Sequence, residues 1–153
     1  MKATLPLLAL IVGASYPALG QNLQGTWKPV QVVVDSGPDR GRHTADVQPG
    51  LLIFSKRHYS MTFVPGFKPR PVPSDSATDE QLGLSFLRFT ANAGTYQRKD
   101  STIVFSPSVA KHPAVMSGTP LIVVARIKRD TLWAKLGGRG GSATWTWVRV
   151  ERP

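Results

Sequence analysis

The sequence predicts an all-β fold: an eight-stranded antiparallel up-and-down barrel with one helix inserted between strands 3 and 4. Apolar and polar residues alternate with a period of two over much of the chain after residue 21, as in strands with one buried face. Short turns join most successive strands, which makes neighbouring strands antiparallel. The sequence lacks the alternation of strands and long helices that a parallel sheet requires. Eight antiparallel strands close into a barrel, which removes exposed sheet edges.

The first 20 residues have the pattern of a secretory signal peptide. Lys2 gives a positive start, residues 5–14 are apolar and uncharged, and small residues lead to Gly20. This apolar run is shorter than the roughly 20 residues that a membrane-spanning helix needs; the alternative is an uncleaved N-terminal anchor. We therefore expect a signal peptide over residues 1–20, a barrel domain over residues 21–153, and a periplasmic or secreted location.

The composition excludes several classes of site. The 153 residues include no cysteine, which rules out disulfides, thiolate metal sites and thiol nucleophiles. Without Lys2, 18 of the 19 basic residues remain against 9 acidic ones, a balance of +9. Such a charge favours anionic partners, but the basic residues are scattered and not gathered in the stripe that nucleic-acid binders use. We expect no nucleic-acid partner, with an anionic envelope surface as the alternative.

The strands are predicted from β-branched and aromatic residues bounded by turn signals. They cover residues 25–34, 51–54, 59–64, 95–99, 102–106, 121–128, 131–136 and 142–150. Four prolines in residues 65–73 exclude a central strand or a helix there and predict an extended loop. Residues 107–119 read as a longer loop. The glycine-rich residues 137–141 read as a hairpin loop, since they lack the ending of a phosphate-binding loop.

One helix is predicted, over residues 79–93. Thr78 and Gln81 have the spacing of a capping box at its start, and Gly94 is suited to end it. Its apolar residues recur at spacings of four and three: Leu82, Phe86 and Phe89. We expect this face to pack on the barrel.

The first and last strands carry a pair of residues with a known counterpart. Gly25 and Trp27 open the first strand, and Arg149 lies in the last. This pattern resembles the lipocalins, whose last-strand arginine lies across the first-strand indole at the closed end of the barrel. A guanidinium packs well on an indole face and can satisfy backbone carbonyls there. These three residues are therefore expected to be a structural signature.

The chain is most similar in pattern to the bacterial lipocalin-like domain family. The matching segments are residues 23–28 (LQGTWK), 50–54 (GLLIF), 59–61 (YSM) and 93–96 (AGTY). The resemblance covers nearly all of residues 22–151 and implies the barrel, but it implies little about function. Family members often carry histidine or acidic residues on the strand after the last of these segments. Residues 102–106 have no ionisable group, which argues against an enzyme.

A search for catalytic and metal-binding patterns finds none. The three histidines, His43, His58 and His112, lack the spacing of metal ligands. No serine lies in a nucleophile elbow, and no pair of carboxylates has a spacing that suggests acid–base chemistry. We therefore assign no catalytic residue, no metal ligand and no cofactor.

The remaining hypothesis is a ligand pocket inside the barrel, lined by apolar groups with a few polar anchors. The expected ligand-binding residues are Tyr59, Met61, Phe63, Tyr96, Phe105, Arg126 and Trp133. Arg126 would anchor an anionic head if it points inward; the alternative places it on the outer wall. A barrel filled by its own side chains is a further alternative.

Three functions follow from these observations. The first is an exported protein, monomeric or dimeric, that binds a small apolar or amphipathic ligand, including an anionic one. The second is a barrel enzyme of the cyclase or isomerase type, with Arg126, Tyr59 or Tyr96 as the working group. The third is an envelope protein that binds polyanions through its basic surface.

Overall fold

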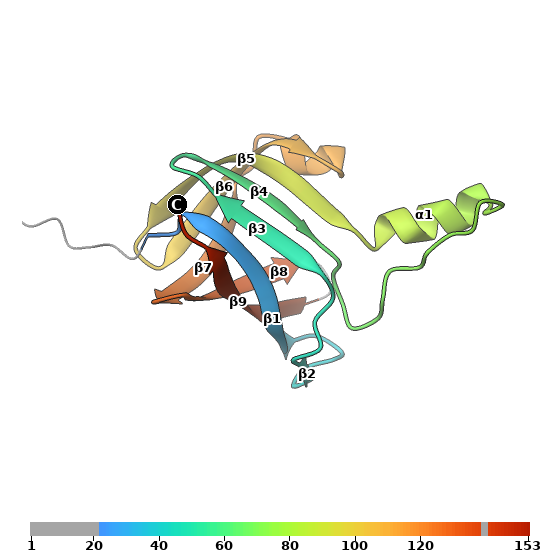
Figure 1. The fold of residues 1–153 in the computed structure, drawn as a ribbon, viewed down its shortest axis with the longest axis horizontal. Coiled ribbons are helices and arrows are strands. Elements are labelled where there is room, and N and C mark those ends of the chain that lie inside the picture. Colours follow the sequence, from blue (N-terminus) through green and yellow to red (C-terminus); the bar gives the residue numbers. More distant parts are fainter. Residues whose placement is uncertain (1–21, 139–140) are drawn as a thin grey trace, which may run out of the picture.

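The computed structural model describes residues 22–138 and 141–153, and these form a closed antiparallel barrel (Figure 1). In chain order the elements are β1 (Gly25–Ser36), β2 (His43–Thr44), β3 (Gly50–Phe54), β4 (His58–Phe63), α1 (Asp79–Leu87), β5 (Thr90–Lys99), β6 (Thr102–Ala110), a 3-10 helix (Pro113–Met116), β7 (Leu121–Lys128), β8 (Thr131–Gly138) and β9 (Gly141–Glu151). The predicted signal peptide lies outside the described residues.

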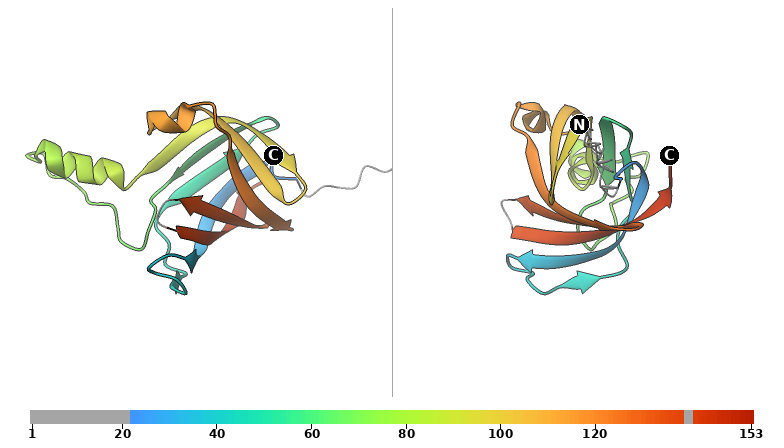
Figure 2. Two further views of the ribbon diagram at one scale, coloured as in Figure 1. Left: turned by 180° about the vertical axis from the view of Figure 1, so that it is seen from behind. Right: turned by 90° about the vertical axis from the view of Figure 1, so that its left-hand side faces the viewer.

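Strand pairing follows the chain. From β3 to β9 each strand pairs with the next, β1 pairs with β3, and β1 pairs with β9 to close the barrel. The two-residue β2 pairs with β1 alone and stands outside this circle. The two further views in Figure 2 show the strands curving around into a single barrel. The prediction of an all-β, eight-stranded antiparallel barrel is confirmed.

Two predictions about the helix are wrong. It lies between β4 and β5 and not between the third and fourth strands, because the short β2 adds a strand. It also ends at Leu87 and not at residue 93, because Thr90 to Gly94 pair with β4. Gly94 is not a helix stop: an added Cβ would lie 2.1 Å from the Ser106 carbonyl oxygen, where the β5–β6 register shifts. The helix start is as predicted, with the Thr78–Gln81 capping box present.

The core fills the inside of the barrel with alternate residues of every long strand. Its members are buried and apolar: Leu23, Trp27, Val32, Leu52, Phe54, Tyr59, Met61, Phe63, Ile103, Phe105, Val123, Ala125, Ile127, Leu132, Ala134, Trp145 and Trp147. Seven of these are aromatic, so each contributes a large buried area. The residues between them face outward.

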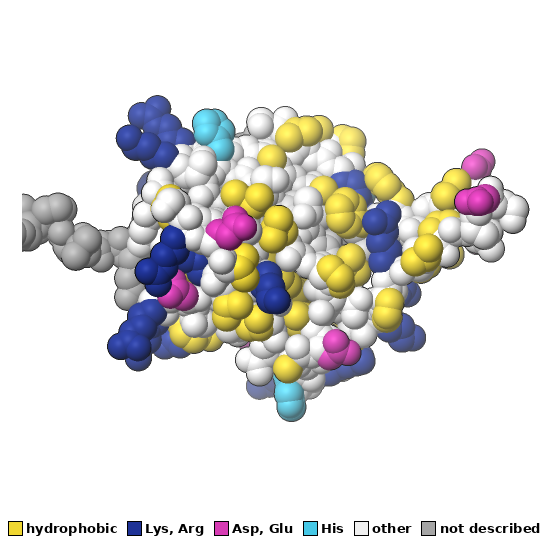
Figure 3. Space-filling model, viewed as in Figure 1, with side chains coloured by type: hydrophobic (Ala, Val, Ile, Leu, Met, Phe, Trp, Pro, Cys, Tyr) yellow, Lys and Arg dark blue, Asp and Glu magenta, His cyan; other side chains and the backbone are white. Residues whose placement is uncertain are grey.

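Helix α1 stands away from the barrel at the end of a long loop (Figures 1 and 2). The expected packing of its apolar face on the barrel is wrong: Phe86 is 51% exposed and Leu82 is 49% exposed. Phe89, beyond the helix, is half-buried beside Arg70. Figure 3 shows hydrophobic side chains along this projection and acidic side chains at its far end. Among the described residues, no helix has the length and hydrophobicity to cross a lipid bilayer.

Candidate functional site

In the part of the chain that the structure describes, side chains fill the barrel interior. Tyr59, Met61, Phe63 and Phe105 all point inward as expected and are at most 8% exposed. They pack in an aromatic cluster in which Tyr59 and Phe105 have ring centroids 4.6 Å apart. The cavity that remains beside Met61 and Phe105 measures about 10 Å³, no more than one water molecule needs. Ligand pockets measure roughly 300–1,000 Å³, so this interior is filled.

The two tyrosine hydroxyls considered for chemistry are held in structural hydrogen bonds. The Tyr59 hydroxyl donates to Asn92 Oδ1 at 2.6 Å, and burial raises the pKa of Tyr59 to about 12. The Tyr96 hydroxyl donates to the Ser55 carbonyl oxygen at 2.9 Å, and burial also raises the pKa of Tyr96. Both hydroxyls therefore stay protonated at neutral pH, and each donates a hydrogen bond within the protein.

The other two expected ligand-binding residues lie on the outer wall. Arg126 on β7 pairs in register with Trp133 on β8. Because Ala125 and Ile127 are buried in the core, the alternation of the strand directs Arg126 outward. Of the two orientations left open for Arg126, the structure therefore shows the one on the outer wall, and Trp133, which was expected in a pocket inside the barrel, lies on the outer wall with it.

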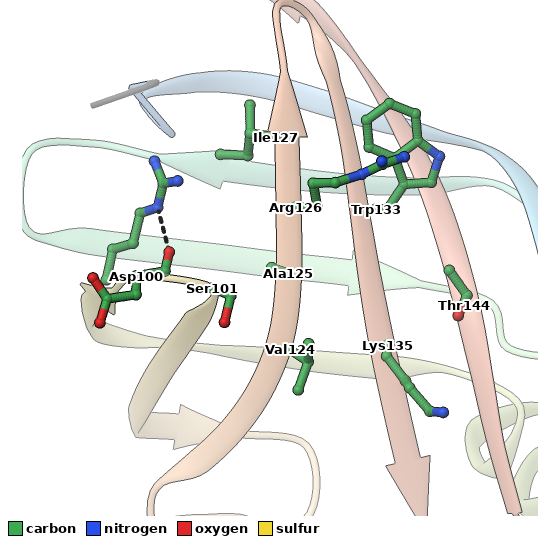
Figure 4. Close-up of a pocket in the computed structure, with 10 residues that line it drawn as sticks. Asp100, Ser101, Val124, Ala125, Arg126, Ile127, Trp133, Lys135 and Thr144 are labelled. Atoms are coloured by element: carbon green, nitrogen blue, oxygen red, sulfur yellow. Dashed lines mark hydrogen bonds between the residues drawn. The ribbon is translucent and has the colours of Figure 1, made fainter. Parts of the chain in front are cut away.

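Arg126 and Trp133 belong instead to a surface pocket of about 490 Å³ (Figure 4). We name it the Trp133 pocket. Its lining residues are Arg98, Asp100, Ser101, Val124, Ala125, Arg126, Ile127, Trp133, Lys135 and Thr144. Its volume is within the range of small-molecule sites, and it is open to solvent over the outer faces of β7, β8 and β9.

The strand registers explain why a hollow forms here. Pairing of β6 with β7 ends at Thr102 and Val124, whereas β7 continues along β8 as far as Lys128. The β5–β6 turn at Asp100 therefore stops short of the end of β7. The last hydrogen bond between this turn and β7 is donated by the Ala125 amide to the Ser101 carbonyl oxygen, at 2.7 Å. Beyond this hydrogen bond β7 has no pairing with β6, and the hollow lies beside Arg126.

The pocket is basic and has an aromatic face. Arg98, Arg126 and Lys135 bring three cations, against the single carboxylate of Asp100 in the lining. The guanidinium carbon of Arg126 lies 4.2 Å from the centroid of the Trp133 ring. Lys135 Nζ is 3.6 Å from Asp35 Oδ2, outside the lining. The arrangement is suited to a ligand with a negative group and a planar or apolar part.

In the residues that the structure describes, the Arg126 guanidinium makes no hydrogen bond and no ion pair. Its recorded contact is the Trp133 ring. A guanidinium has five N–H donors in a planar fork that matches a carboxylate or a phosphate. Stacking fixes the position of the Arg126 group and leaves those donors available to a ligand.

At the closed end of the barrel, Arg149 lies over the Trp27 ring, with its guanidinium carbon 4.2 Å from the centroid. It donates to the carbonyl oxygens of Gln24 and Asn22, the latter at 2.6 Å. Gly25 has φ of +119°, and an added Cβ there would lie 2.3 Å from the Glu151 carbonyl oxygen. This cluster joins the last strand to the segment that leads into the first strand, through the two hydrogen bonds that Arg149 donates to backbone carbonyl oxygens.

The three histidines lie apart in the structure. His43 is in β2, His58 begins β4, and His112 precedes the 3-10 helix. Within residues 22–138 and 141–153, no three side chains of the metal-binding types come together.

Sequence reasoning found Arg126 and Trp133 but missed Arg98, Lys135 and Thr144. A usable signal was present for one of them, because Lys135 is two residues from Trp133 and so lies on the same face of a strand. Arg98 comes from the end of β5 and Thr144 from β9. Their approach depends on the end of β6 and on the β8–β9 register, which the sequence pattern does not reveal.

Comparison with known proteins finds structural similarity only. No protein-family model and no curated protein matches this chain. Among solved structures, an uncharacterized protein from Bacteroides eggerthii DSM 20697 is 11% identical over 84% of this chain and 99% of that chain, with a TM-score of 0.45. A redesigned β-barrel is 14% identical over 83% of this chain and 90% of that chain, with a TM-score of 0.41.

Proposed function

We propose that this chain is an exported, lipocalin-like binding protein that takes a small amphipathic anion in the Trp133 pocket. The export signal and the family likeness rest on the sequence patterns over residues 1–20 and 22–151. The ligand class rests on the chemistry of the pocket. The site is on the outer wall because the interior cavity, at about 10 Å³, is far too small.

One observation carries this proposal. The Arg126 guanidinium is positioned on an aromatic face, with its donors unused by the described protein, in a hollow of about 490 Å³. An anionic head would pair with Arg126 while the apolar part of the ligand covers Trp133 and Val124. Both halves of an amphipathic anion therefore have a partner.

The test is binding of two fluorescent probes that differ in charge: anilinonaphthalene sulfonate, which is an amphipathic anion, and the neutral N-phenylnaphthylamine. We expect the wild-type protein to bind the sulfonate at one site per chain. Arg126→Met should weaken that binding about tenfold or more, since a charge-assisted pair contributes roughly 1.5–3 kcal/mol. The neutral probe should bind weakly and respond little to the substitution.

Lys128→Met is the matched control. Lys128 lies two residues along β7 from Arg126, is exposed like it, and is outside the pocket lining. Its loss changes the net charge equally but should leave sulfonate binding intact. If Arg126→Met and Lys128→Met weaken binding to the same extent, the protein attracts anions through its overall charge and the proposed pocket is wrong.

A further inference from the structure

The segment that stands away from the barrel has a charge opposite to the rest of the chain. Residues 71–87, which we name the acidic arm, contain three of the nine acidic residues and no lysine or arginine. The arm therefore has a net charge of −3 in a chain of +10, and the remaining residues sum to +13. The acidic residues are Asp75, Asp79 and Glu80.

The arm is also apolar and uncovered. Exposed apolar side chains follow its whole length: Val72 (93%), Leu82 (49%), Leu84 (53%), Phe86 (51%) and Leu87 (62%). Ser85 alone is buried in α1. Asp79, Leu82 and Phe86 recur at spacings of three and four, which places an acidic group and two apolar ones on one helix face. The arm is thus itself an amphipathic anion.

The structure holds the arm in this outward position. Arg70 Nε donates to the Ser85 carbonyl oxygen at 3.0 Å, and Ser85 Oγ donates to the Pro71 carbonyl oxygen at 2.8 Å. Lys111 Nζ donates to the Phe86 carbonyl oxygen at 2.7 Å, at the end of the helix. These bonds fix the base of the arm. Lys111 Nζ also lies 4.6 Å from the centroid of the Phe86 ring, while about half of Phe86 and of Leu82 remains exposed.

The arm cannot reach the Trp133 pocket of its own chain. Two residues separate the end of α1 from the start of β5, and the pocket lining includes Arg98 and Asp100, which lie at and just beyond the other end of that strand. A strand of ten residues spans roughly 30 Å. The arm also points away from the barrel (Figure 1). An arm that occupies a Trp133 pocket must therefore belong to another molecule.

We propose that the acidic arm of one copy docks in the Trp133 pocket of a second copy. This inference rests on the proposed function, because it uses the same pocket and names its partner. Leu82 and Phe86 would cover Val124 and Trp133, and Asp79 would meet the Arg126 guanidinium. This is the groove recognition of an amphipathic helix. The contact joins the arm of one copy to the pocket of another, which are different surfaces. Two copies can therefore exchange arms in a closed dimer, or successive copies can form an open chain.

The test is sedimentation velocity over a range of protein concentrations at low and high salt. Wild-type protein should self-associate as concentration rises, and salt should weaken the association because it screens the charges. The double variant D79K/E80K reverses the sign of the arm's net charge, and R126E reverses the charge of the side chain at position 126 in the pocket. Each should be monomeric where the wild type associates, with an affinity loss of about tenfold or more. The control D39K/D46K makes the same charge change outside the arm and should associate at least as well as the wild type.

Mixing the two variants is decisive. The arm of R126E and the pocket of D79K/E80K are both intact, so an equimolar mixture should form a dimer that neither protein forms alone. This result would not depend on whether the reversed arm keeps its helix, since only the pocket of that variant is used. If R126E associates like the wild type, as it would if two arms paired with each other, the proposal is overturned. It is also overturned if the mixture stays monomeric.

The proposal and the proposed function fail in different ways. The sulfonate probe should dissociate the wild-type assembly, because it competes for Arg126. If the probe binds through Arg126 while the wild type stays monomeric at every concentration, the arm does not dock and the ligand pocket stands. If the protein associates through arm and pocket but dilute monomer does not bind the probe, the pocket is a protein-docking site and the small-ligand function is wrong.

Discussion

Arg149 shows at the scale of one residue how a buried cation stabilises the barrel. Its side chain is 8% exposed, covers Trp27, and places Nε 3.1 Å from Asp130 Oδ1. We expect Arg149→Ala to lower the free energy of unfolding by about 3 kcal/mol, because it removes a nearly buried guanidinium that donates to the Gln24 and Asn22 carbonyl oxygens and covers the Trp27 indole. Urea denaturation followed by tryptophan fluorescence measures this loss.

Arg152 supplies a matched control for this prediction. It also pairs with Asp130, with Nη2 2.6 Å from Oδ2, but its side chain is 74% exposed. The hydrogen bond from Arg152 is the main reason that the pKa of Asp130 is lowered. Arg152→Ala should leave the urea midpoint nearly unchanged, since exposed ion pairs contribute little. Equal losses in the two variants would show that the Asp130 pairing, and not burial against Trp27, accounts for the effect.

At the scale of the element, we expect α1 to unfold separately from the barrel. It buries one side chain, and its start depends on the Thr78–Gln81 capping box. Thr78→Ala should lower the stability of the helix by about 1 kcal/mol. Amide hydrogen exchange over Asp79–Leu87 should then be roughly fivefold faster, while exchange in the strands stays unchanged. Ser76→Ala, which alters a nearby hydroxyl outside the cap, should change neither. Faster exchange in the strands as well would mean that helix and barrel unfold together.

The same region shows what sequence patterns predict and what they miss. The helix start was predictable because the capping box is local, with both its hydrogen bonds three residues apart. The helix end was not, because residues 90–94 continue an apparent helical pattern and become strand only through pairing with β4. Leu82 and Phe86 form a helical face that pattern reasoning assigns to a core. Such a pattern shows that a helix face is apolar. It does not show whether that face is covered by the same molecule or by another one.

The same limit applies to the candidate site. Alternation predicted that Tyr59, Met61 and Phe63 share a face, and they point into the barrel together. Arg126 stood in an apolar strand, and alternation left its direction open until the burial of Ala125 and Ile127 placed it outside. Whether the inward-facing residues surround a cavity depends on how seven aromatic side chains pack against one another. The alternation of residues along a strand does not report that packing.

At the scale of the whole molecule, the barrel is stabilised by a core that leaves a cavity of about 10 Å³. The core runs through every long strand without disulfides, so its packing must supply the stability. Leu132 is completely buried and borders that cavity. Leu132→Ala should therefore lower the free energy of unfolding by about 3–4 kcal/mol and enlarge the cavity to a size that admits a small apolar molecule.

Benzene distinguishes a filled barrel from a hollow one. Added benzene should raise the free energy of unfolding of the Leu132→Ala protein by about 1–2 kcal/mol, because it binds the folded state alone. The wild type should not respond. Ile122→Ala removes a side chain that is 69% exposed on the outer wall of β7, and it should neither destabilise strongly nor create a benzene response. Stabilisation of the wild type by benzene would reveal interior space, and the barrel interior would then be a candidate ligand site in place of the outer wall.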